Sequence, residues 1–172
     1  MALLHPAIWS QYGHAWVCGV LADCLDAGMI LIAPGSDWRG PIAAADFVLG
    51  DYGSVPTFAA GIGTPVLKLP HGPQPLLEGT PAASLSAEAP GWDPERPLEP
   101  QLEAAARAQR QGLGLHIADQ LTSVPGKAAQ NLQDVMYRLL GLTAPAPVSH
   151  QKQHVPYPRL VNWPRDVRPP RR

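Results

Sequence analysis

Residues 45–69 follow the order strand, Gly/Ser turn, short helix, turn and strand, which constrains the fold more than any other feature of the chain. The apolar run Phe47–Leu49 suits a strand, Gly61 and Gly63 end the helix, and Val66–Leu69 suits a second strand. Two strands joined through one helix by such short connections run parallel, with a right-handed crossover. The pattern therefore predicts a strand–helix–strand unit.

The turn before this helix is a candidate phosphate site. Ser54 suits the N-cap, and Pro56 falls in the first helical turn, where a missing N–H costs nothing. The Gly53 and Val55 amides and the Ser54 hydroxyl then meet at the positive end of a helix, which favours anions. Because a phosphate repels a carboxylate, Asp51 is expected to brace the loop by accepting an N–H bond. The alternative for Asp51 is to hold a ribose or glycerol hydroxyl, or a divalent ion bridged to the phosphates.

Two further apolar segments precede this unit. Leu3-Leu4 is short, and Met29–Ala33 is a continuous apolar run typical of a strand buried on both faces of a parallel sheet. A helical pattern over residues 15–27 lies between them, and a short helix starting at Ser36 or Asp37 follows. This alternation predicts an α/β fold, a Rossmann-like parallel sheet of four strands with flanking helices.

Ligands of such sheets bind beyond the carboxyl ends of the strands. The polar residues that follow the expected strands should therefore gather on one rim. Arg39, in the first turn of its helix near that rim, is a further candidate for phosphate binding, and Tyr52 packs or stacks there. The expected rim comprises His5, Gly35, Ser36, Asp37, Asp51, Gly53, Ser54 and His71.

The chain is rich in proline after residue 70. Residues 1–142 are expected to form one domain, with a core over 1–70, an irregular wrap over 71–100 and helices over 101–142. The last of these helices, over 128–140, has a clear amphipathic pattern that ends at Gly141. Residues 143–172 form a tail rich in Pro and Arg that is expected to be disordered.

The formal net charge of −1 argues against a general nucleic-acid binder, but the charge is unevenly distributed. Residues 151–172 hold six Lys or Arg and one acidic residue, so the first 150 residues carry the opposite sign. The basic tail is a candidate contact for anionic lipid headgroups or an anionic polymer, and a merely solvated tail is the alternative.

Cys18 and Cys24 lie six residues apart in a helical pattern, too far apart for a disulfide, and neither has a metal-ligand neighbour. They are expected to be reduced core thiols, which fits a cytoplasmic protein. No apolar run is long enough to span a bilayer.

Part of the chain resembles a known family. The segment around Asp51-Tyr52-Gly53-Ser54-Val55 is similar to the ADxxITDYSSxxFDxxxxxKPxxF segment of CDP-glycerol glycerophosphotransferases, the teichoic-acid polymerases and primases of the GT-B type. His5-Pro6 matches a His-Pro early in that family's donor domain. In two places the sequence departs from the pattern: Gly53 replaces the first of two serines, and Thr57-Phe58-Ala59 replaces a Phe-Asp pair. The matching residues are Ala45, Asp46, Asp51, Tyr52, Ser54, Val55, Phe58 and Pro65.

The resemblance implies the nucleotide-binding C-terminal half of a GT-B protein. Its activity would be transfer of a glycerol-phosphate, polyol-phosphate or sugar unit from a nucleotide-activated donor in cell-envelope polymer synthesis. The donor diphosphate would rest on Gly53–Val55 with Arg39, and His5 would act as the catalytic residue at the phosphate or leaving group. Donor-site support would come from Asp51, Tyr52, Ser36 and His71. No cofactor beyond the donor is implied.

Two alternatives stay open. A nucleotide-sugar 2-epimerase-like protein shares the architecture, although Asp51-Tyr52-Gly53-Ser54 replaces the Asp-Ser-Gly-Gly of that family. A non-catalytic nucleotide-binding remnant or regulatory module is the other, because family members build the acceptor site from an N-terminal domain that we do not find here. The expected location is cytoplasmic, peripheral at the inner membrane face.

Overall fold

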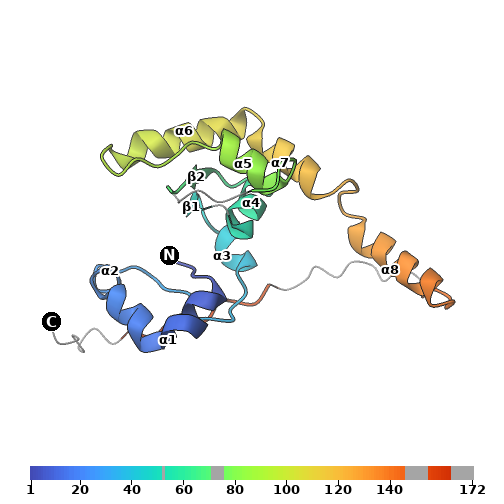
Figure 1. Cartoon of the computed structure of the whole chain (residues 1–172), viewed down its shortest axis with the longest axis horizontal. Helices are drawn as coiled ribbons and strands as arrows, with labels where there is room; N and C mark the ends of the chain where they lie inside the picture. The colour runs from blue at the N-terminus through green and yellow to red at the C-terminus, as the bar shows by residue number, and fades with distance from the viewer. Residues whose placement is uncertain (52, 71–75, 146–154, 164–172) are drawn as a thin grey trace. The chain divides into compact units, whose positions relative to one another are not determined.

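The protein is a mixed α/β structure of eight helices and a two-stranded parallel sheet in the residues that the computed structural model describes, 1–51, 53–70, 76–145 and 155–163 (Figure 1). The chain divides into two compact units. The first unit comprises Met1–Pro41 with Val155–Arg172, and the second comprises Ile42–His154. The domain boundary expected at residue 142 stays a prediction.

Two helices form most of the first unit. Helix α1 (Pro6–Val20) starts at the proline that follows His5, and α2 (Ala22–Asp26) continues after a break at Leu21. Gly13, with φ of 77°, kinks α1 in its middle, a conformation that glycine adopts without strain. The helical pattern expected over residues 15–27 is therefore confirmed but extends further towards the N-terminus. The core of the unit comprises Trp9, Val17, Cys18, Leu25 and Leu31.

The first unit pairs three extended segments around Leu31. Ala2 forms a parallel bridge with Leu31, where the Ala2 N–H donates to the Ile30 carbonyl at 2.7 Å. On the other side, Ile32 forms an antiparallel bridge with Leu160. The Met29–Ala33 segment thus makes isolated bridges, and Ala2 pairs with it where Leu3-Leu4 was expected, so neither apolar run forms a regular strand.

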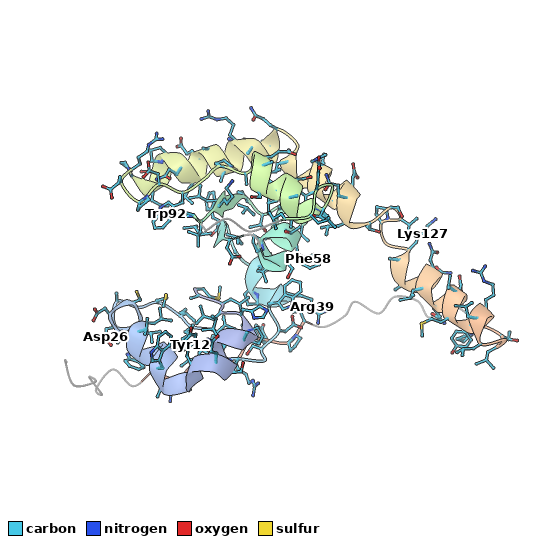
Figure 2. The ribbon with its side chains drawn as sticks, in the orientation of Figure 1. Tyr12, Asp26, Arg39, Phe58, Trp92 and Lys127 are labelled. Carbon is cyan, nitrogen blue, oxygen red and sulfur yellow. The ribbon has the colours of Figure 1, made fainter. Side chains whose placement is uncertain are left out.

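Residues 155–163, which belong to the expected disordered tail, take part in this pairing. The Ala33 N–H donates to the Arg159 carbonyl and the Val161 N–H donates to the Leu31 carbonyl, both at 2.8 Å. The Trp163 indole N–H donates to Asp26 Oδ1, also at 2.8 Å; Asp26 is labelled in Figure 2. The C-terminal segment thereby completes the first unit, which its proline-rich composition does not indicate.

The second unit contains the strand–helix–strand unit that the sequence predicts. Strand β1 (Val48–Gly50) pairs in parallel with β2 (Val66–Lys68), in a register that sets Val48 opposite Val66. Helix α4 (Ser54–Gly61) connects the two strands, and the short helix α3 (Arg39–Ala43) comes before β1. On its other side β2 forms a parallel bridge to Gly91 through Lys68. The described residues thus show a two-stranded sheet where four adjacent strands were expected.

Helices α5 (Pro81–Glu88), α6 (Leu98–Arg110) and α7 (Leu113–Leu121) complete the packed part of this unit. Helix α7 packs against α4, α5 and α6. The prediction of an irregular segment over 71–100 is wrong for α5, because Pro81 occupies the first helical turn and the Thr80 hydroxyl caps the helix. Buried apolar residues from these elements include Ala59, Leu67, Leu85, Ala105 and Ile117.

Helix α8 (Ala128–Leu139) follows and buries none of its residues. Its apolar side chains recur at helical spacing and stay exposed, at 61% for Leu132, 53% for Met136 and 79% for Leu139. The amphipathic helix expected here is confirmed, but its apolar face has no cover among the described residues. No described helix combines the length and the apolar character that crossing a bilayer demands.

Candidate functional site

The candidate phosphate turn lies between the end of β1 and the start of α4. Gly53, with extended backbone angles (φ −70°, ψ 173°), is the N-cap residue, and Ser54 is the first residue of α4. The expectation that Ser54 caps the helix is therefore wrong by one position. No side chain of the described residues caps the N–H groups of this helix, and the Thr57 hydroxyl instead donates to the Gly53 carbonyl at 3.2 Å.

Asp51 braces the turn as expected. Its Oδ1 accepts the Gly53 N–H at 2.9 Å, which closes an Asx-type turn directly before α4. One of the three donors assigned to the phosphate site is thus already bound to a carboxylate. The Ser54 and Val55 amides have no hydrogen-bond partner among the described residues, and the Ser54 side chain is exposed.

Gly50 fixes the approach of the strand to the helix, a role that the sequence analysis did not assign. A Cβ placed on Gly50 would lie 2.9 Å from Cγ and 3.0 Å from Cβ of Pro56. Only glycine lets the end of β1 approach the rigid proline ring in the first turn of α4 this closely. The signal in the sequence is the pairing of a glycine at a strand end with a proline six residues later.

His5 has a structural role in the first unit. Its Nδ1 accepts the Ala7 N–H at 3.1 Å, so the imidazole caps the N-terminus of α1. The side chain is exposed, and Nε2 has no partner among the described residues. A catalytic role for His5 stays a prediction.

Ser36 bonds to the C-terminal segment, and Asp37 and Arg39 form an ion pair with each other. The Ser36 hydroxyl donates to the Arg159 carbonyl at 3.2 Å and accepts the Arg159 N–H at 3.1 Å. Arg39, labelled in Figure 2, donates from Nε and Nη2 to the Asp37 carboxylate, with a shortest distance of 2.5 Å. The side-chain hydrogen bond from Arg39 lowers the pKa of Asp37 to about 2, and the same pair raises the pKa of Arg39. A phosphate at Arg39 would therefore compete with Asp37.

The predicted site residues divide between the two units. His5, Ser36 and Arg39 belong to the first unit, whereas Asp51 and the turn Gly53–Val55 belong to the second. Tyr52 and His71 lie outside the described residues. The common rim expected for all of these residues stays a prediction.

The His, Cys, Asp and Glu side chains decide whether the chain offers a metal site or a reactive thiol. Among the described residues, no three His, Cys, Asp or Glu side chains gather as a metal site would require. Cys18 is buried, its Sγ lies 3.7 Å from His14 Nδ1, and burial raises the pKa of the thiol. Cys24 is exposed, which corrects the expectation that both thiols lie in the core.

Comparison of the chain with protein-family models, curated proteins and solved structures gives no match.

Proposed function

We propose that the chain binds the diphosphate of a nucleotide-activated donor at the turn between β1 and α4. It would do so as the donor half of a GT-B type transferase that moves a glycerol-phosphate, polyol-phosphate or sugar unit in cell-envelope polymer synthesis. One observation carries the proposal: a parallel strand–turn–helix–strand unit presents, at an exposed helix start, a hydroxyl and two amides that have no partner among the described residues.

The donors for the phosphate are the amides of Ser54 and Val55 and the Ser54 hydroxyl. Asp51 keeps the Gly53 N–H and holds the loop in the shape that exposes the other two amides. The Asp51 carboxylate also repels a phosphate at short range, so the anion binds on the helix side of the turn. The positive end of the α4 dipole contributes to the attraction there.

The finer fold is part of the proposal. The Val48 N–H donates to the Pro65 carbonyl and the Gly50 carbonyl accepts the Leu69 N–H, so the Leu49 N–H and carbonyl face the opposite edge of β1. Leu49 is 42% exposed, and that edge has no strand neighbour among the described residues. A Rossmann-like half of a GT-B protein needs a further parallel strand at this edge. Met29–Ala33 already pairs on both edges, with Ala2 and with Leu160, so Leu3-Leu4 is the candidate in the sequence.

A second candidate function is a nucleotide-binding module without catalysis. The observation in its favour is that His5 accepts the Ala7 N–H and caps α1, so the residue expected to act on the leaving group already has a structural task. In this reading the donor still binds at the turn, but no group is transferred.

Thermal-shift measurements test donor binding. CDP, UDP, CDP-glycerol and a UDP-sugar are titrated against the full chain and the Ser54→Ala variant, with Ser123→Ala, another exposed serine, as the matched control. We expect a cytidine diphosphate ligand to raise Tm in the wild type and in Ser123→Ala, and Ser54→Ala to weaken binding by roughly 3- to 10-fold, the loss of one hydrogen bond. No Tm shift with any ligand would refute the proposal.

Two further arms separate the alternatives. Gly53→Ser restores the serine of the resembling family at a backbone conformation open to any residue, with a Cβ 3.1 Å from Asp51 Oδ1, which must shift by a few tenths of an ångström. Tighter CDP-glycerol binding is expected from this variant. Release of the nucleotide from CDP-glycerol with an added polyol acceptor indicates a transferase, whereas binding without release indicates the module. Preference for a UDP-sugar, with its conversion to an epimer, indicates the epimerase-like alternative.

We also propose two surfaces that would contact partners of this transferase. The exposed apolar face of α8 is a surface on which an acceptor domain or partner chain would pack. The basic residues of 151–172 would hold the chain at an anionic membrane surface. Co-sedimentation with anionic vesicles but not with neutral vesicles is expected, and equal behaviour with both would exclude the membrane contact.

A further inference from the structure

A chain of polar side chains joins helices α5 and α7. Ser84 and Glu88 lie one turn apart on α5, and His116 and Gln120 lie one turn apart on α7. Ser84 Oγ lies 3.0 Å from both Oε1 and Nε2 of Gln120. His116 Nε2 lies 2.8 Å from Gln120 Nε2 and 3.3 Å from Glu88 Oε1.

His116 Nε2 has two neighbours that require opposite protonation states of this nitrogen. The Gln120 amide nitrogen can only donate, so it needs an unprotonated His116 Nε2. The Glu88 carboxylate can only accept, so it needs a protonated Nε2. While the amide nitrogen faces the ring, His116 Nε2 therefore satisfies one neighbour at a time, and the proton on this nitrogen decides which.

We propose that protonation of His116 reverses the direction of the hydrogen bonds between α5 and α7. With Nε2 unprotonated, the Ser84 hydroxyl donates to Gln120 Oε1 and the Gln120 amide donates to Nε2. With Nε2 protonated, His116 donates to Glu88 and to Gln120 Oε1, because the amide has turned over. The turned amide then donates to Ser84 Oγ. The equal distances from Ser84 to the two amide atoms accommodate both directions.

The surroundings leave Glu88 as the charge that responds to this proton. Helix α4 has no charged residue, and α6 carries Glu99, Glu103, Arg107 and Arg110. Asp119 is the acidic residue of α7 itself. Within the described residues, only Glu88 lies at ion-pair distance from His116, whose side chain is 52% exposed. The switch is thus open to protons from solvent and acts on one carboxylate.

Side-chain NMR of the full chain tests the proposal. The ring nitrogens of His116 are assigned by the loss of their signals in His116→Asn, and their shifts are followed from pH 8 to pH 5. At pH 8 we expect the proton on Nδ1 and the unprotonated nitrogen at Nε2. As the ring becomes charged, the side-chain amide signals of Gln120 should move in step with it. A proton on Nε2 at pH 8 would overturn the proposal, because the hydrogen bonds would then already point in the acidic direction.

Two variants test the proposal without relying on the NMR assignment of the His116 ring nitrogens. Ser84→Ala removes the hydroxyl that bonds to the Gln120 amide, so this amide should respond less to the protonation of His116. Glu88→Gln removes the ion pair, and its Tm should fall below that of the wild type by about 1–3 °C at pH 5.5 but not at pH 8. An equal Tm deficit at both pH values would show a merely structural contact and contradict the switch.

Discussion

At the scale of single residues, Gly50 and Asp51 shape the candidate turn in different ways. Gly50 lets strand and helix approach, because any side chain there would meet the Pro56 ring. Asp51 closes the loop by accepting the Gly53 N–H. The turn is therefore defined before any ligand binds, which lowers the entropy cost of binding an anion there.

Gly50→Ala should destabilise the protein. The new methyl would lie 2.9 Å from Pro56 Cγ, and a proline ring cannot rotate away, so we expect a loss of about 1–3 kcal/mol in the free energy of unfolding. Urea denaturation measures it. Gly91→Ala is the matched control, because Gly91 also borders β2 and a Cβ there meets no atom within 4 Å. Equal stability of the two variants would show that the contact with Pro56 is not tight.

The Asp37–Arg39 pair predicts a pH dependence. Since the pKa of Asp37 falls from 3.8 to about 2 on folding, its contribution to stability is complete above about pH 4 and is lost as the pH falls through about 2. Asp37→Asn should therefore lower the urea midpoint slightly at pH 7, and the deficit should shrink as the pH approaches 2. Asp46→Asn, an exposed carboxylate without an ion pair among the described residues, serves as control. A deficit that stays constant across this range would contradict the assignment.

At the scale of elements, the crossing of α4 and α7 depends on small residues. A Cβ on Gly114 would lie 1.9 Å from the Gln109 amide nitrogen and 2.7 Å from the Ala60 carbonyl oxygen. A Cβ on Gly61 would meet only the flexible end of Leu121 within 3.4 Å. The backbone of α7 at Gly114 thus lies close to that of α4 at Ala60. This crossing also positions the helix whose first turn is the candidate phosphate site.

Gly114→Ala should therefore cost more stability than Gly61→Ala. The first change displaces the Gln109 side chain and pushes against the Ala60 backbone, at about 1–3 kcal/mol, and the second needs only a rotation of Leu121. Urea denaturation of the pair measures the difference, and each variant is the control of the other. A larger loss for Gly61→Ala would contradict this account of the crossing.

The sequence predicted most elements and few of their contacts. Glycines and prolines mark the ends of β1, α4 and β2 clearly, since each has a strong local preference there. Helix α5 was missed because Pro81 was counted as a helix breaker when it lies in the first helical turn. The pairing of Leu160 with Ile32 was missed because it joins residues far apart in sequence, which local patterns do not report. For the candidate site, the bracing role of Asp51 was predicted, whereas the cap position and the role of Gly50 needed coordinates.

At the scale of the whole molecule, removal of the C-terminal segment should affect the two units differently. A chain that stops at residue 154 loses the Arg159 and Val161 hydrogen bonds and the Trp163 contact with Asp26. We expect faster amide exchange at Ala33 in the first unit and unchanged exchange in β1 and β2. Hydrogen exchange measured residue by residue gives the comparison. Unchanged exchange at Ala33 would show that residues 155–163 do not hold the first unit together.

The first unit is made of two segments that lie before and after the second unit in the sequence. Its N-terminal part leaves the ribosome first, but the partner of Ile32 is Leu160, which emerges only after residues 42–154. The second unit can therefore fold while the nascent N-terminal part still exposes an unpaired edge. During translation that edge is open to chaperones or to wrong partners until residues 155–163 have emerged.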